Sequence, residues 1–354
     1  MSFCECSKRI VMEKKRIMVA MSGGVDSSVT AALLQQQGHE VQGMTMRVWD
    51  GPVDVATDAR RVADQLGIPF HLVDLREEFQ QRVVKPFCSE YMQGRTPNPC
   101  VLCNQAFKFR LLLEQAQTLG ADQLATGHYV RVLERDGRYL LAKGHSVHKD
   151  QSYFLFTLTQ EQLSRVRFPL GEMNKDQVRA KAVELGLSVA GKSDSQDICF
   201  IPDADYVGFL EGQCGSADRS GQIVHVDGQV LGRHEGIYRY TIGQRRGLGL
   251  AWTEPLFVVR IDAAQRQVVV GERHHLDVSE LIATDCNWIM AEPSEPLRCR
   301  VRIRYRHREA SATVTVLGEG RCRVVFDEPE KGITPGQAAV FYEEDLVLGG
   351  GWIA

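Results

Sequence analysis

Met21-Ser22-Gly23-Gly24-Val25-Asp26-Ser27-Ser28 is the stretch that decides the fold of the first part of this chain. An apolar run at residues 17–20 precedes it and an alanine- and leucine-rich run at 29–34 follows, which predicts a strand, a glycine turn and the start of a helix. The two adjacent glycines allow positive φ and a close approach of backbone N–H groups to an anion. The N-terminus of the helix also favours a phosphate. The stretch therefore predicts a phosphate-binding loop.

The spacing within the loop excludes two common phosphate loops. No lysine follows the glycines as in G-x-x-x-x-G-K-[ST], and the G-x-G-x-x-G spacing of dinucleotide-binding proteins is absent. The remaining pattern, S-G-G-x-D-S, resembles the loop of the PP-loop ATP pyrophosphatases. That resemblance implies cleavage of ATP between its α and β phosphates and adenylation of a substrate oxygen. The alternative reading is an ordinary strand-to-helix turn.

The overall composition is that of a soluble protein. The chain has 354 residues, enough for two or three domains, with 44% hydrophobic and 25% charged residues. Its net charge of −3 does not indicate nucleic-acid binding, so any basic surface must be local. Residues 1–15 lack the apolar core of a signal peptide and no apolar run is long enough to span a membrane, so we expect a cytoplasmic protein without a membrane partner.

Strand and helix patterns alternate from residue 15 to about residue 126. The expected strands are residues 17–20, 41–46, 69–73 and 123–126, and the expected helices are residues 26–37, 55–66, 77–92 and 104–119. This alternation predicts an α/β fold with a doubly wound parallel sheet covered by helices on both faces.

Such sheets bind ligands at the carboxyl ends of their strands, where residues 22–27, 45–46 and 127–128 should meet. We expect this crevice to hold the nucleotide. The expected ATP-binding residues are Ala20, Met21, Ser22, Gly23, Gly24, Val25, Asp26, Ser27, Met46 and Gly127.

The later part of the chain has a different pattern. Residues 150–195 are predicted to be a helical part, with a helix at 172–187, followed by a polar loop at 191–200 that ends in a buried strand. Beyond residue 212 the apolar period changes to two, with strands expected at 222–226, 230–233, 257–262, 267–271, 298–308, 312–317, 321–327 and 338–342. We expect a PP-loop catalytic domain at 1–211, a small central β domain at 212–275 and a β-barrel-like domain at 276–354.

The ten cysteines are more plausible as buried, catalytic or metal-binding thiols than as disulfides in a cytosolic protein. In T-P-N-P-C-V-L-C-N at residues 96–104, a helix is expected just after Cys103, and its dipole should lower the pKa of that thiol. The Cys100-x-x-Cys103 pair is alternatively half of a zinc site or a redox pair, although a second pair is missing. Cys199 ends the polar loop and is either reactive or simply buried. No role is assigned to Cys4 and Cys6. The cysteines predicted to lie in the hydrophobic core are Cys88, Cys214, Cys286, Cys299 and Cys322.

Several blocks together resemble the bacterial tRNA-specific 2-thiouridylases of the PP-loop superfamily. They are S-G-G-V-D-S at 22–27, T-P-N-P at 96–99 with C-N at 103–104, T-G-H-Y at 126–129, K-D-Q-S-Y-F at 149–154, D-S-Q-D-I-C-F at 194–200 and G-Q-R-R-G-L-G at 243–249, with R-Y-R at 304–306 and T-P-G-Q at 334–337. The resemblance runs from residue 15 to residue 352 and is far more selective than any single motif.

The resemblance implies conversion of the wobble uridine (U34) of tRNAs such as those for lysine, glutamate and glutamine to 2-thiouridine. ATP with Mg²⁺ would adenylate O2 of the uridine, and a persulfide on Cys199 would deliver sulfur to C2. Cys103 would be the second, nucleophilic thiol and would form a disulfide with Cys199 as AMP leaves. A sulfur-relay protein or cysteine desulfurase is the implied donor. The residues implied to contact tRNA or the target base are Asn98, Pro99, Cys100, His128, Lys149, Asp150, Gln151, Arg304, Tyr305 and Gln337.

One position departs from the family pattern. Many members have an acidic residue where this chain has Cys100, so that residue cannot serve here as a carboxylate base. Related sulfur-inserting enzymes hold a [4Fe-4S] cluster on three cysteines, and Cys100, Cys103 and Cys199 are the candidate ligands for a cluster-dependent alternative.

Arginine occupies every second position from residue 298 to residue 308, six residues in all. On one long strand they would form a basic stripe of roughly 33 Å suited to tRNA phosphates, or else a charged edge strand. Two other functions compete: a PP-loop ligase that adenylates a small molecule, and an RNA-binding protein with a degenerate nucleotide domain. The paired thiols disfavour the first and the intact phosphate loop disfavours the second.

Overall fold

The computed structural model describes residues 13–49, 55–193, 198–215 and 219–354. Its N-terminal part is built on a parallel sheet with the order β3-β2-β1-β4-β7. The central strand β1 (Arg16–Ala20) pairs with β2 (Glu40–Arg47) and with β4 (Gln123–Ala125). The edges are β3 (Phe70–Asp74) and β7 (Val166–Arg167). The predicted doubly wound α/β fold is confirmed, and its strand order reverses between β1 and β4.

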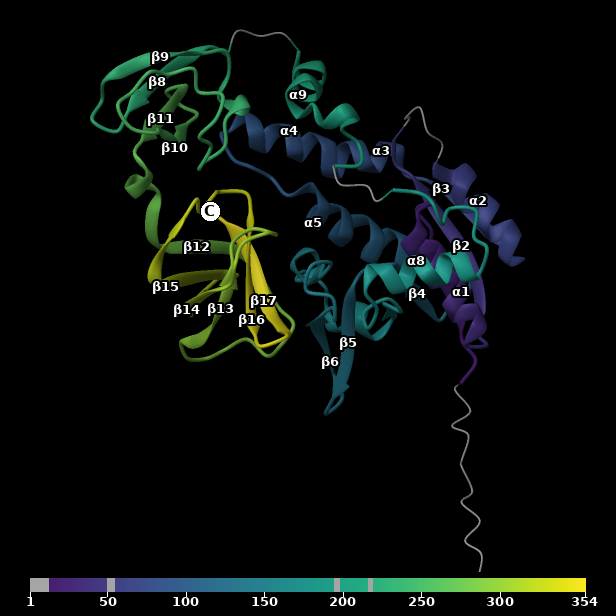
Figure 1. The fold of residues 1–354 in the computed structure, drawn as a ribbon. Helices are drawn as coiled ribbons and strands as arrows, with labels where there is room; N and C mark the ends of the chain where they lie inside the picture. The colour runs from purple at the N-terminus through teal and green to yellow at the C-terminus, as the bar shows by residue number, and fades with distance from the viewer. Residues whose placement is uncertain (1–12, 50–54, 194–197, 216–218) are drawn as a thin grey trace, which may run out of the picture.

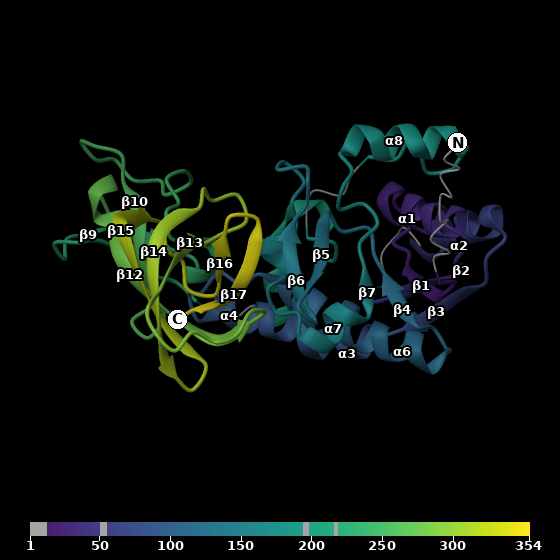
Figure 2. The ribbon, with the colours of Figure 1, turned by 90° about the horizontal axis from the view of Figure 1, so that it is seen from below.

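Helices cover both faces of this sheet. Successive residues of β1 point to opposite faces, and the apolar residues on each face pack against a different set of helices. Ile17 and Val19 pack with α1 (Val25–Gln36), α2 (Val55–Leu66) and α8 (Lys175–Glu184). Met18 instead packs with the helical run that ends in α6 (Leu112–Thr118). Figure 2 shows α1 and α8 on one side of the strands and α6 on the other.

Two long helical runs contain wider π-helical turns. The first consists of α3 (Arg76–Phe79), η1 (Gln80–Val84) and α4 (Lys85–Met92). The second consists of α5 (Pro99–Cys103), η2 (Asn104–Leu111) and α6. The second run therefore begins at Pro99, and the expectation that it starts after Cys103 is wrong. Proline at the first helical position has no N–H to lose, and its fixed φ suits a helix start.

The C-terminal part forms the expected barrel. Its strands are β12 (Asp277–Trp288), β13 (Leu297–Arg302), β14 (Ala310–Gly318), β15 (Arg321–Lys331), β16 (Ala338–Glu343) and β17 (Leu346–Ile353). Their order is β12-β15-β14-β13-β16-β17, and pairing of β12 with β17 closes the barrel. The expected strand at 298–308 is wrong in its second half, because β13 ends at Arg302.

A β-hairpin that the sequence analysis missed joins the barrel to the N-terminal part. β5 (Val130–Arg135) and β6 (Arg138–Lys143) are connected by Asp136 and Gly137, both at positive φ as a two-residue hairpin turn requires. β6 also pairs with β17, so residues 141–142 lie beside residues 346–347. Figure 1 shows this hairpin between the sheet and the barrel.

The remaining elements form a small central sheet and several short helices. β8 (Gly221–His225), β9 (Val230–His234), β10 (Phe257–Asp262) and β11 (Gln267–Gly271) agree with the four strands expected there and lie in the order β10-β11-β8-β9. The helices are η3 (Ser152–Leu155), α7 (Gln160–Ser164), η4 (Pro202–Ala204), α9 (Tyr206–Cys214), η5 (Ile237–Arg239) and η6 (Arg273–Leu276). Within the described residues, no helix is both long and apolar enough to cross a bilayer.

Candidate active site

The phosphate loop is held by its own hydroxyl groups. Gly23 has φ +68°, and Gly24 is the N-cap of α1. The Ser22 N–H donates to Ser27 Oγ at 3.1 Å, and Ser28 Oγ donates to the Gly24 carbonyl at 2.8 Å. These bonds fix the bend, so that the backbone N–H groups at the start of α1 are available to an anion.

The ends of three strands meet at this loop, on the side where the strand order reverses. Thr45, near the end of β2, donates from Oγ1 to the Met21 carbonyl at 2.6 Å. Gly127 follows β4, and a Cβ built on it would lie 2.9 Å from the backbone carbon of Asp26 and 3.0 Å from the Ser27 nitrogen. The segment after β4 therefore touches the loop backbone directly, and only glycine fits there without displacement.

Two lysines that the sequence analysis missed also contact the loop. Lys175, at the start of α8, lies 2.8 and 2.9 Å from the two carboxylate oxygens of Asp26. Lys192 donates to the Gly23 carbonyl at 3.1 Å and pairs with Asp58 at 2.8 Å. The hydrogen bond from Lys192 holds the pKa of the Asp58 carboxyl below its usual value. Neither lysine belongs to a phosphate motif along the chain, so only the tertiary structure reveals them.

The geometry of the loop fits a nucleotide triphosphate. Backbone N–H groups at the start of α1 lie at the loop together with the ammonium groups of Lys175 and Lys192, which pair with Asp26 and Asp58; N–H and ammonium groups suit a polyanion. Mg²⁺ bound to a nucleotide is usually held by one or two carboxylates together with the phosphates, and Asp26 is the carboxylate within the loop. Of the remaining predicted contacts, Ala20 is the last residue of β1 and Met46 lies near the end of β2, and both are half-buried.

The C-x-x-C pair lies within the first turns of α5. Asn98 is the N-cap residue, and its side-chain oxygen accepts from the Val101 N–H at 3.4 Å. Pro99 is buried at the first helical position. Cys100 is exposed and Cys103 is half-buried, on the same short helix.

The environment of these thiols opposes thiolate formation, contrary to the expectation from the helix dipole. Burial raises the pKa of Cys103 to about 12, while Lys108 lowers it, and Cys199 and Cys100 raise it further. Burial also raises the pKa of Cys100 and of Cys199, although both residues reach the surface. Desolvation of the charged form outweighs the dipole here.

The three predicted thiols share an electrostatic environment. The charges of Cys199 and Cys100 raise the pKa of Cys103, and Lys108 opposes the rise in the pKa of all three thiols. The expected strand at the end of the Cys199 loop is wrong, because residues 199–200 form a turn whose Phe200 side chain is buried.

The [4Fe-4S] cluster on Cys100, Cys103 and Cys199 stays a prediction. Among the residues with described positions, no three His, Cys, Asp or Glu side chains are grouped as metal ligands. We therefore assign no step to a [4Fe-4S] cluster.

His128 directly follows Gly127 and is buried among aromatic rings. Its Nδ1 is 2.7 Å from Thr126 Oγ1, and its ring centroid is 5.8 Å from that of Phe109 and 6.1 Å from that of Phe168. Burial lowers the pKa of His128 well below its usual value, and Lys108 lowers it further. His128 is therefore neutral at physiological pH.

The barrel holds the segment that leads into α5. Gln337 Nε2 donates to the Thr96 carbonyl at 2.9 Å, and the Thr96 N–H donates to the Pro335 carbonyl at 2.8 Å. A Cβ on Gly336 would lie 3.0 Å from the Thr96 oxygen. Gln337 therefore positions the chain that carries Cys100, in addition to any contact with RNA.

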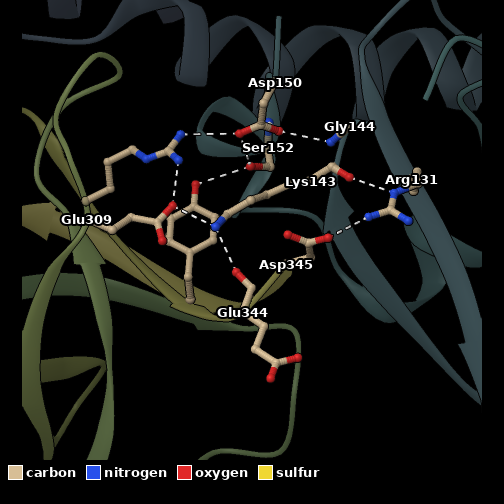
Figure 3. A network of polar contacts seen from close by, with 10 residues as sticks. Arg131, Lys143, Gly144, Asp150, Ser152, Glu309, Glu344 and Asp345 are labelled. Carbon is tan, nitrogen blue, oxygen red and sulfur yellow. Dashed lines mark hydrogen bonds and ion pairs between the residues drawn. The ribbon is translucent and has the colours of Figure 1, made fainter. Parts of the chain in front are cut away.

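Asp150 is the centre of a buried polar network between the hairpin and the barrel (Figure 3). Its carboxylate accepts from Ser152 Oγ at 2.9 Å, from the Gly144 N–H at 3.2 Å and from Arg302 at 3.3 Å. The neighbouring Gln151 accepts the Tyr129 N–H at 3.0 Å, and Lys149 is half-buried. Asp150 and Gln151 thus have internal partners.

The arginines do not form the expected stripe. Arg302 points into the same network and lies 2.6 Å from Glu309, while Arg298 pairs with Asp327. Arg304 lies beyond the end of β13 and donates to the Lys331 carbonyl at 3.1 Å. The ring of the neighbouring Tyr305, in the turn after the strand, packs at a tilt of 41° against that of Phe154, with 4.5 Å between the ring centroids.

Comparisons with known proteins agree with this arrangement along the whole chain. Family models match as a tRNA methyl transferase HUP domain at residues 15–203, a tRNA methyl transferase PRC-barrel domain at 208–272 and an aminomethyltransferase beta-barrel domain at 278–353. A tRNA-specific 2-thiouridylase MnmA from Syntrophotalea carbinolica is 64% identical over 97% of this chain and 99% of its own length. The protein of the same name from Geobacter metallireducens is 57% identical over 96% and 97%.

Among solved structures, a 4-thiouridine synthetase–RNA complex with bound ATP gives a TM-score of 0.39 at 21% identity, over 56% of this chain and 50% of that one. This overlap is too slight to carry functional meaning.

Proposed function

This chain belongs to the tRNA-specific 2-thiouridylase family, and from that premise we propose that it converts the wobble uridine of tRNA to 2-thiouridine at the expense of ATP. The single observation that carries the proposal is the contact between the helical run that carries Cys103 and the segment that follows β4. The ring centroid of Phe109, in η2 of that run, lies 5.8 Å from that of His128, and His128 follows the glycine that touches the phosphate loop. This contact supports a phosphate site beside a thiol site, as an adenylation followed by sulfur transfer requires.

The first half of the reaction uses the phosphate loop. The N–H groups of α1, Lys175 and Lys192 hold the phosphates of ATP, which would enter with Mg²⁺. O2 of uridine attacks the α-phosphorus and pyrophosphate leaves. The purpose of this step is chemical, because C2 of uracil is a poor electrophile until O2 becomes part of a leaving group.

The second half uses the thiols. A persulfide on Cys199 attacks C2, and AMP leaves with the former O2. The Cys103 thiolate then attacks Cys199 Sγ and breaks the bond to the transferred sulfur, which gives 2-thiouridine and a Cys103–Cys199 disulfide. Burial raises the pKa of both thiols, and the charge of Lys108 favours this step because it offsets part of that rise. A persulfide-bearing relay protein or a cysteine desulfurase supplies the sulfur, and a reductant restores the thiols.

Pyrophosphate release tests the proposal against the rival ligase. With unmodified tRNA for lysine, glutamate or glutamine, we expect ATP-dependent pyrophosphate release that stops when the tRNA is omitted. A matched tRNA with cytidine at the wobble position should be inactive. Cys199→Ser should keep the tRNA-dependent pyrophosphate release, because adenylation precedes sulfur transfer. Release without tRNA would contradict the proposal and favour a small-molecule ligase.

A further inference from the structure

Two further cysteines, remote in sequence, meet in a groove between α4 and α9. Cys88 on α4 is 7% exposed, and Cys214, the last residue of α9, is half-exposed. Both line a cavity of about 300 Å³ together with Met92 and Gln213. The helix ends are also joined by a hydrogen bond of 3.0 Å from Gln80 to Gln213. One thiol of the pair is thus sheltered and the other reaches solvent.

The two thiols face the same cavity. The Cys88 and Cys214 side chains both line it, and they pack in the same hydrophobic cluster. Burial, with a smaller effect of Cys214, raises the pKa of Cys88 to about 12. A disulfide forms between two such thiols when rotation of their side chains brings the sulfur atoms to about 2.05 Å.

The pair lies beside the cluster that anchors the Cys199 turn. Phe200, the neighbour of Cys199, packs edge-on against Phe87 at a centroid distance of 5.4 Å. It also packs against Phe209 of α9 at 5.4 Å. Phe87 immediately precedes Cys88 on α4. A disulfide between α4 and α9 would therefore restrict the movement of the two helices that pack against Phe200.

We propose that Cys88 and Cys214 form a dithiol oxidation site, at which a hydroperoxide produces a disulfide between α4 and α9. The Cys214 thiolate attacks one peroxide oxygen, the O–O bond breaks, and a sulfenic acid and water (or an alcohol) form. The Cys88 sulfur then attacks the sulfenic sulfur, its proton leaves with the hydroxyl group as water, and the S–S bond forms. Two thiols are oxidised and one peroxide is reduced, and a dithiol reductant reverses the change. This chemistry is independent of the proposed thiolation reaction.

A second thiol pair in the barrel provides an internal comparison. Cys286 on β12 contacts Cys322 on β15 through a side-chain hydrogen bond. Cys322 is 1% exposed within the barrel core, whereas Cys286 is half-exposed, as Cys214 is. Both pairs therefore offer a peroxide one accessible thiol, and the barrel pair shows whether any such pair of thiols becomes linked.

The test uses the full-length chain with Cys100→Ser, Cys103→Ser and Cys199→Ser, so that the thiols of the active site cannot contribute. The protein is treated with one equivalent of hydrogen peroxide, alkylated with iodoacetamide and mapped by mass spectrometry without reduction. We expect a linked pair of peptides that contain Cys88 and Cys214, a loss of two alkylatable thiols per chain, and their recovery with dithiothreitol. Adding Cys214→Ser, at a half-exposed position that should leave folding intact, should abolish the link.

Three results would overturn the proposal. Cys88 could remain fully alkylatable after peroxide treatment. Cys214 could pass to a sulfinic acid without forming the link. The link could form first between Cys286 and Cys322. Circular dichroism of each variant confirms that these results are read from folded protein.

Discussion

Gly127→Ala is the sharpest perturbation of the nucleotide site that the structure offers. The backbone conformation of Gly127 is one that alanine can adopt, so any effect comes from the added methyl group. That methyl group would lie 2.9 Å from the Asp26 carbonyl carbon and 3.0 Å from the Ser27 nitrogen. Both are backbone atoms at the start of α1, which cannot rotate away as a side chain would. The phosphate loop must therefore move.

The expected size follows from the cost of overpacking. Inserting one extra methyl group into a packed site costs about 1–3 kcal/mol. If this cost falls on the nucleotide-bound state, where the loop has to be in place, the Kd for ATP rises roughly 5- to 140-fold, since about 1.4 kcal/mol is tenfold. Stability of the free protein should change less, because the loop can shift when no ligand is bound.

Isothermal titration with ATP and Mg²⁺ measures this effect directly. Gly212→Ala is the matched control, because a Cβ at Gly212 meets no atom within 4 Å and lies in α9, away from the loop. Its affinity for ATP should equal that of the unmodified chain. If Gly127→Ala binds ATP as tightly as Gly212→Ala does, the assignment of this crevice to the phosphates is wrong.

Three other predictions concern the barrel and the thiols. Arg302→Met should lower the free energy of unfolding in urea by about 3–5 kcal/mol, because it removes the cationic partner of the buried Asp150. Arg298→Met, at an exposed ion pair, should not change that free energy measurably, and equal effects of the two variants would contradict the buried network. Cys103 in the free enzyme should react slowly with iodoacetamide at pH 8, and the rate should rise about tenfold per pH unit because the pKa of this buried thiol is about 12. A rate that reaches a plateau near pH 9 would contradict a buried thiol. Gln337→Ala should lower kcat/KM for tRNA roughly fivefold, about 1 kcal/mol, because it removes the hydrogen bond to the Thr96 carbonyl. The Kd for ATP should not change, and a weaker affinity for ATP would show that Gln337 acts on the nucleotide site instead.

Local patterns predicted the sheet and the phosphate loop because their causes are local. The apolar runs and the glycine turn lie within a few residues of each other, and β1, β2, β3 and β4 all appear where expected. Lys175 and Lys192 were missed because they reach the loop from far along the chain. The hairpin at residues 130–143 was missed although Asp136-Gly137 is a strong turn signal.

Two predictions, the arginine stripe and the lowered pKa of Cys103, were wrong because contacts from other parts of the fold outweigh the local pattern. Alternating arginines define one face only while the strand continues, and β13 ends at Arg302, before the turn in which Tyr305 packs on Phe154. The acidic partners of Arg302 could not be recognised because Asp150 lies on another part of the chain. Likewise, the helix dipole predicts a lower pKa for Cys103, but burial dominates and raises it.

Nucleoside analysis of the product tests the central claim most directly. Unmodified tRNA is incubated without oxygen with this protein, ATP, Mg²⁺ and a persulfide source, and the digested nucleosides are measured by mass spectrometry. We predict new 2-thiouridine that requires ATP, is lost in Cys199→Ser and Cys103→Ser, and persists in Cys214→Ser. Folded, ATP-binding protein that forms no thiolated nucleoside, or thiolation that survives Cys199→Ser, would contradict the account.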